Sequence, residues 1–150
     1  MIILSKNQLE ALLDANGIYA ENALILDSQY ALPTKRWLLN EFAVALRNWY
    51  FSLGLSGYTA GSNDCENFAR GAAFYADLAH RNSSRKNGVE TTGLAFGEFW
   101  YRQRDGKGGH AINIAIVAEG KPEIIFFEPQ TQQQVPLIQQ EIAPCIGYRF

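Results

Sequence analysis

The sequence contains few of the residues that mark specialised classes of protein. Only 2 of its 150 residues are cysteine, too few for a disulfide scaffold. Its 13 basic and 15 acidic side chains leave a formal net charge of -2, which gives no basis for a nucleic-acid or anionic-membrane partner. No apolar run approaches the roughly 18 residues of a membrane span, and the N-terminus lacks a signal-peptide pattern. We therefore expect a cytoplasmic protein with no nucleic-acid or membrane partner.

The rest of the composition is that of an ordinary folded domain. Hydrophobic residues make up 47% of the chain and charged residues 19%, which is not the profile of a disordered protein. A chain of 150 residues is long enough to bury a core, and no repeat or linker divides it. We predict one domain over residues 1–150 and leave its oligomeric state open.

Helical patterns dominate the first half of the chain. Ser5 and Gln8 form a capping-box pair at the start of a first helix, which Gly17 is well placed to end. A second, strongly apolar helix is predicted between Pro33 and Gly54. Most of its aromatic side chains are expected to pack in the core, although one of them could line a cleft.

A third helix is predicted to start beside Cys65, after a glycine-rich turn. Asn63 is a suitable N-cap and Glu66 its capping-box partner, which makes Cys65 the second helical residue. Unpaired backbone N–H groups and the helix dipole stabilise a thiolate at such a position. Cys65 is therefore a candidate nucleophile. We expect His80 to lie in the last turn of this helix, where a cation suits the dipole, and a polar loop to follow from Arg81.

Extended patterns follow in the second half of the chain. Helices first and then a mainly antiparallel sheet predict an α+β fold, with the N-terminal helices packed on one sheet. The predicted strands are Thr92–Tyr101, His110–Val117, Glu123–Glu128 and Ile146–Phe150.

A cysteine nucleophile needs a base, and the chain has only two histidines. His80 would lie roughly 22 Å from Cys65 along the same helix, which leaves His110. If the hairpin loop after the His110 strand has an odd number of residues, position 112 faces Glu128, and His110 reaches Glu128 diagonally. Gln130 shares this parity and is the alternative orienting group. We expect the isoleucine-rich face of this strand to pack on the Cys65 helix.

A metal centre is not expected. One Cys, one His and one Glu without CxxC or HxxxH spacing form a weak ligand set. We predict neither a metal nor another cofactor.

Three short motifs of this chain resemble those of one enzyme family. The motifs are Asn63-Asp64-Cys65-Glu66-Asn67-Phe68-Ala69, Gly108-Gly109-His110-Ala111 and Phe127-Glu128-Pro129-Gln130. They resemble the transglutaminase-like branch of the papain-like superfamily, and are most similar to its bacterial cysteine peptidases. The resemblance implies a papain-like fold with Cys65 as nucleophile, His110 as base and Glu128 as orienting acid, where the branch usually has Asp. Geometry alone suggests the Cys65 N–H and the Asn63 side chain as oxyanion donors.

These observations predict a cysteine-dependent acyl-transfer enzyme, which the resemblance makes a thiol peptidase or amidase. It would cleave an amide of a protein or peptide through a Cys65 thioester, with hydrolysis favoured over transamidation. The alternative is an inactive protein on the same papain-like scaffold that binds or inhibits another protein.

Overall fold

The computed structural model describes residues 2–20, 22–55, 64–87, 92–104, 106, 108–143 and 145–150. Within these ranges the helices are α1 (Lys6–Ala15), the π-helix η1 (Trp37–Phe42), α2 (Ala43–Ser52), α3 (Cys65–Lys86) and α4 (Gln139–Ile142). The strands are β1 (Ile3–Ser5), β2 (Asn22–Leu24), β3 (Gln29–Ala31), β4 (Gly93–Leu94), β5 (Phe96–Arg102), β6 (Gly109–Glu119), β7 (Lys121–Glu128), β8 (Gln133–Val135) and β9 (Gly147–Arg149).

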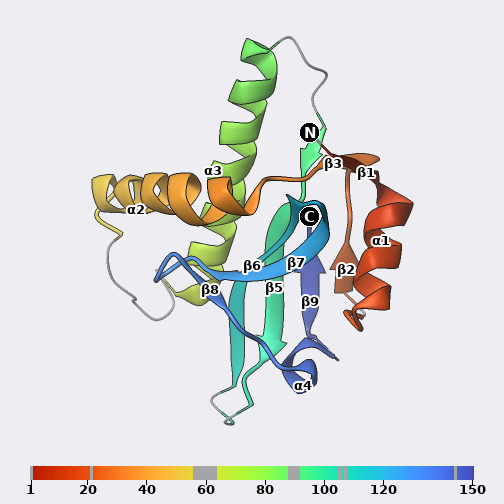
Figure 1. Cartoon of the computed structure of the whole chain (residues 1–150). Coiled ribbons are helices and arrows are strands. Elements are labelled where there is room, and N and C mark those ends of the chain that lie inside the picture. The colour runs from red at the N-terminus through yellow and green to blue at the C-terminus, as the bar shows by residue number, and fades with distance from the viewer. Residues whose placement is uncertain are drawn as a thin grey trace.

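The described strands form two sheets of mixed direction (Figure 1). The smaller has the order β1-β3-β4, and the larger has the order β2-β9-β5-β6-β7-β8. The pairs β2–β9 and β3–β4 are parallel, and the others are antiparallel. In Figure 1, α1 lies on one side of the larger sheet, and α2 and α3 lie on the other.

The larger sheet therefore buries both of its faces. On one face the three isoleucines of β6 form a core with Leu9 and Leu13 of α1. On the other face Ala115 and Val117 of β6 pack in a second core with Ala72 of α3. The prediction of helices packed on one sheet did not anticipate that α1 covers the face opposite to α2 and α3, and the predicted packing of the isoleucine face on the Cys65 helix is wrong. Alternation could not distinguish the faces, because both sides of this central strand are apolar.

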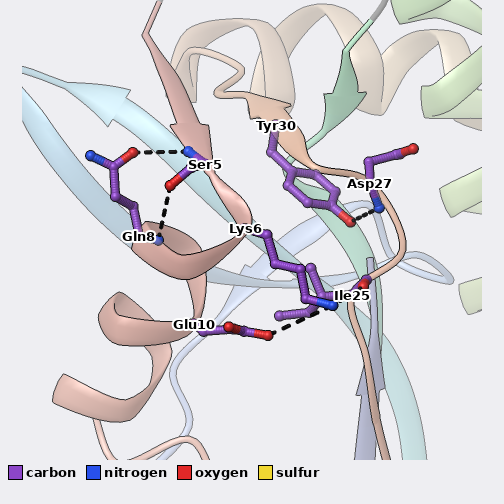
Figure 2. A network of polar contacts seen from close by, with 7 residues as sticks. All are labelled: Ser5, Lys6, Gln8, Glu10, Ile25, Asp27 and Tyr30. Carbon is purple, nitrogen blue, oxygen red and sulfur yellow. Dashed lines mark hydrogen bonds and ion pairs between the residues drawn. The ribbon is translucent and has the colours of Figure 1, made fainter.

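The start of α1 agrees with the prediction (Figure 2). The Ser5 N–H donates to Gln8 Oε1 at 2.8 Å, and the Gln8 N–H donates to Ser5 Oγ at 3.3 Å. The Lys6 ammonium then donates to the Ile25 carbonyl at 3.0 Å, which ties the helix to the chain that follows β2. Gly17, with a φ of +72°, follows the C-cap as expected.

Helix α3 differs from the prediction at its start. Asp64 is the N-cap, and its N–H donates to Asn67 Oδ1 at 3.3 Å in a capping box. Cys65 is therefore the first helical residue rather than the second. The predicted cap, Asn63, lies outside the described residues.

The same helix also continues beyond its predicted end. Its buried stripe runs through Ala72, Ala76, His80 and Ser84 at four-residue spacing, so burial carries the helix to Lys86. His80 is only 8% exposed, and its Nε2 lies 3.0 Å from the Thr92 carbonyl oxygen. The predicted position of His80 in the last turn is therefore wrong, because α3 continues to Lys86.

The β6–β7 hairpin has the predicted register. Ile114 pairs with Phe126, so position 112 lies opposite position 128. Pairing continues to Glu119 and Lys121, so Gly120 alone forms the turn, and the loop has an odd number of residues as the prediction required. Gly120 has a φ of +78°, which favours glycine.

A buried amide joins α3 to the sheet. Asn113 is fully buried, and its Nδ2 donates to the carbonyls of Ala69 at 2.8 Å and Gly97 at 3.0 Å. Two backbone acceptors on different elements are thereby satisfied, which positions the first turns of α3 against β5 and β6.

Candidate functional site

The structure brings together two of the predicted site residues, His110 and Glu128. His110 Nε2 and Glu128 Oε2 are 2.7 Å apart, and the two side chains are only 20% and 15% exposed. An ionised carboxylate can only accept, so the ring N–H donates this hydrogen bond. The edge of the Tyr101 ring packs against the imidazole at a centroid distance of 5.8 Å. The predicted diagonal contact is confirmed, and the pair forms a polar corner where β6 begins and β7 ends.

The turn after β7 fixes the second oxygen of Glu128. The Gln130 N–H donates to Glu128 Oε1 at 3.0 Å, so Gln130 supports this carboxylate through its backbone. The Gln132 side chain donates to the carbonyls of Pro129 at 2.6 Å and Gln130 at 2.9 Å. Gln132 itself has a φ of +56°, a backbone conformation that these contacts hold in place. The carboxylate therefore has a fixed orientation.

Cys65 is not joined to this pair. Both cysteines are free thiols, and Cys65 is half-buried. No hydrogen bond links Cys65 with His110 in the part of the chain that the structure describes. By strand alternation, His110 continues the β6 face that packs on α1, whereas Cys65 opens the helix packed on the opposite face.

A small pocket lies at the same end of the sheet. Its volume is about 190 Å³, and its lining is Arg47, Tyr50, Phe51, Leu55, Phe68, Gln130 and Gln132. We call this pocket, together with the His110–Glu128 pair, the Glu128 corner. Tyr50 and Phe51 of α2 line it, which agrees with the alternative that an aromatic residue of the second predicted helix lines a cleft.

Polar and aromatic groups line the pocket in the Glu128 corner. Arg47 Nε donates to Gln132 Oε1 at 3.1 Å, and the Phe51 ring is 74% exposed. The Tyr50 hydroxyl donates to the Phe68 carbonyl at 2.6 Å. Burial, with a smaller contribution from the Glu128 carboxylate, raises the pKa of Tyr50, so this hydroxyl remains a donor. The pocket thus combines a rigid polar floor with an exposed aromatic ring.

Metal binding and membrane spanning are two other classes of function on which the described residues bear. No three His, Cys, Asp or Glu side chains among these residues gather so that they could hold a metal ion. No helix in the same ranges has the length and apolar character needed to cross a membrane.

Comparison with known proteins identifies the fold through solved structures. A PSL1a–E64 complex matches 99% of this chain and 51% of its own, with a TM-score of 0.67 and 18% sequence identity. Polyporus squamosus lectin bound to the human-type influenza-binding epitope Neu5Acα2-6Galβ1-4GlcNAc matches 99% of this chain and 49% of its own, with a TM-score of 0.62 and 17% identity. No family model and no curated protein sequence matches. The chain thus spans about half the length of these solved structures, and the likeness establishes a shared fold.

These findings correct the predicted family, fold class and function. The lectin and PSL1a are among the structures that share this fold, and no family model matches the chain. The assignment to the papain-like superfamily is therefore not supported, and neither is the papain-like arrangement of helices on one sheet. The prediction of a cysteine-dependent acyl-transfer enzyme, a thiol peptidase or amidase with a catalytic triad, is not supported either.

The motifs behind that prediction have a simpler physical origin. A polar segment before Cys65 is what a helix N-terminus requires, and glycine before His110 suits a tight connection between strands. The bound ligands of the two solved structures are E64 and a glycan, and a protein or peptide substrate finds no support in them. Neither structure is described with a nucleic acid or a membrane.

Proposed function

We propose that residues 1–150 form a single ligand-binding domain that binds a glycan in the Glu128 corner without chemical conversion. The observation that carries the proposal is the pocket of about 190 Å³ in which the exposed Phe51 ring meets guanidinium and amide groups. This domain is cytoplasmic in the proposal, as the sequence predicts.

The groups lining the Glu128 corner suit a sugar. A saccharide offers hydroxyl groups that both donate and accept, together with C–H faces that pack on aromatic rings. The Gln130 and Gln132 amides can donate and accept, and Arg47 can donate. The Phe51 ring supplies an apolar surface that loses water on binding. Few polar groups in fixed orientations around an apolar surface are typical of small-ligand sites.

The predicted site residues His110, Glu128 and Gln130 keep a place in this proposal. The Glu128 carboxylate, held by His110 and by the Gln130 N–H, anchors the turn that presents Gln130 and Gln132 to the sugar. Cys65 lies one helical turn before Phe68, which lines the pocket. The predicted substrate-positioning role of Asn63 stays a prediction, because Asn63 lies outside the described residues.

The fold supports a glycan more than it supports a peptide. Polyporus squamosus lectin shares the fold and is bound to a sialylated glycan. Because this chain spans about half of that lectin, the fold alone does not decide which half takes the glycan. The chemistry of the Glu128 corner therefore carries the proposal.

Calorimetric titration of the whole chain tests this function. The probes are Neu5Acα2-6Galβ1-4GlcNAc, the same glycan without sialic acid, and E64. We expect saturable glycan binding that weakens about tenfold, or 1.4 kcal/mol, in Phe51→Ala and in Arg47→Ala. Both side chains are exposed, so the variants should fold. Phe74→Ala removes an exposed ring from α3, outside the pocket, and should bind as the unaltered chain does.

Two results would overturn the proposal. One is the absence of saturable binding by either glycan at concentrations up to about 10 mM. The other is binding of E64 alone, since the corner would then recognise a different class of ligand.

A further inference from the structure

A cavity beside α3 is lined by a buried carboxylate, one oxygen of which has no hydrogen-bond partner in the described residues. The cavity has a volume of about 440 Å³ and lies between α3 and the strands β5 and β9 of the larger sheet. Glu98 is 4% exposed and lines it, and its Oε2 has no hydrogen-bond partner in the described residues. A buried charged oxygen without a donor is costly, so this atom is a vacant acceptor.

The positive groups near Glu98 only partly compensate for this cost. Arg70 Nε of α3 lies 4.0 Å from Oε2, and the Arg70 side chain is 63% exposed. Arg149 of β9 pairs with Glu98 across the strands, and its backbone position brings a second guanidinium to the cavity. Burial raises the pKa of Glu98 despite both arginines, and the more distant Glu66 adds to this effect.

Aromatic rings form the apolar wall of the same cavity. Phe96 is buried, and Phe74 projects from α3 with 58% of its surface exposed. An exposed ring beside a cavity gains from covering by an apolar group.

We infer that this cavity binds a small zwitterion of the α-amino acid type, with its ammonium group toward Glu98 and its carboxylate toward Arg70 and Arg149. The vacant acceptor calls for an N–H donor, and the exposed guanidinium groups call for an anion. The ammonium nitrogen and the carboxylate carbon of an α-amino acid are only two bonds apart. Both groups can therefore face Glu98 Oε2 and Arg70 Nε, which lie 4.0 Å from each other. The Phe74 and Phe96 rings favour an amino acid with an apolar or aromatic side chain.

Three probes that differ by one charge each test the inference on the whole chain. They are L-phenylalanine, phenethylamine, which lacks the carboxylate, and 3-phenylpropanoate, which lacks the ammonium group. We expect phenylalanine to bind saturably by NMR titration, and each analogue to bind at least about tenfold more weakly. The site lies apart from the Glu128 corner, so failure of one proposal leaves the other standing.

Variants assign each charge to its partner. Glu98→Gln should remove the preference of the site for phenylalanine over 3-phenylpropanoate. Arg70→Gln should reduce the preference of the site for phenylalanine over phenethylamine. Phe74→Ala should weaken all three probes, whereas the matched variant Phe51→Ala should change none of them. Circular dichroism is the control for the folding of each variant.

Three results would overturn the inference. These are the absence of saturation by about 10 mM phenylalanine, equal binding of the three probes, and an unchanged preference in Glu98→Gln.

Discussion

Replacement of Asn113 tests the account of how α3 is positioned. This side chain is fully buried and donates to the carbonyls of Ala69 in α3 and Gly97 in β5. Asn113→Ala removes these two hydrogen bonds and leaves a small cavity between α3 and β5. Water enters such a space only where it finds several polar partners.

The expected loss of stability follows from these contacts. Two intramolecular hydrogen bonds contribute about 0.5–1.5 kcal/mol each, and the cavity adds to the cost. Asn113 Oδ1 already lacks a hydrogen-bond partner among the described residues, so its removal returns part of that penalty. We therefore expect Asn113→Ala to lower the free energy of unfolding by about 2–4 kcal/mol. In a domain of this size such a loss lowers Tm by roughly 5–15 °C.

Urea unfolding followed by circular dichroism measures this loss, with Asn82→Ala as the control. Asn82 is exposed on α3, where alanine is the better helix former, so its replacement should change stability by less than about 0.5 kcal/mol. A loss below about 1 kcal/mol for Asn113→Ala would refute the reasoning, because the two bonds would then contribute nothing.

Three further changes have definite expected results. Asp64→Ala removes the N-cap of α3 and should cost about 0.5–2 kcal/mol in urea unfolding, whereas no change would show that the cap is unimportant. Gly97→Ala places a Cβ against the Arg149 backbone carbonyl and should separate β9 from β5, so chemical shifts of both strands should move; unchanged shifts would contradict the close approach. In the folded chain the pKa of Glu98 lies above its ordinary value of 4.5. Above that pH the folded chain therefore binds more protons than the unfolded chain. The stability of the unaltered chain should therefore fall relative to Glu98→Gln as the pH rises above about 4.5, and a constant difference would exclude this linkage.

Local patterns predicted several elements correctly. The capping box of Ser5 and Gln8, the last strand and the β6–β7 register all agree with the structure. Each depends on neighbours in the sequence or on the pairing of a single hairpin. The contact between His110 and Glu128 followed from that register, and it is the part of the candidate site that the sequence could supply.

Local sequence patterns could not predict the packing between segments that are distant in the sequence. The faces of β6 are both apolar, so no alternation could show that the isoleucines meet α1 rather than α3. Strands of three residues, such as β1 and β2, carry too little pattern to reveal a mixed sheet. Glu98 is a candidate binding residue because it is buried, and Phe51 because it is exposed. Their sequence neighbours do not determine either property. The papain-like resemblance failed for a related reason, since short motifs fix local geometry and not the family.

Mapping the glycan on the folded chain by NMR tests the central claim most directly. Backbone amide shifts are recorded while Neu5Acα2-6Galβ1-4GlcNAc is added to the unaltered chain. The account predicts saturable changes at Arg47–Leu55 of the α2 end and at Glu128–Gln132 of the turn after β7, with α1 unaffected. Saturable changes confined to other parts of the chain, or no changes at all, would contradict binding in the Glu128 corner.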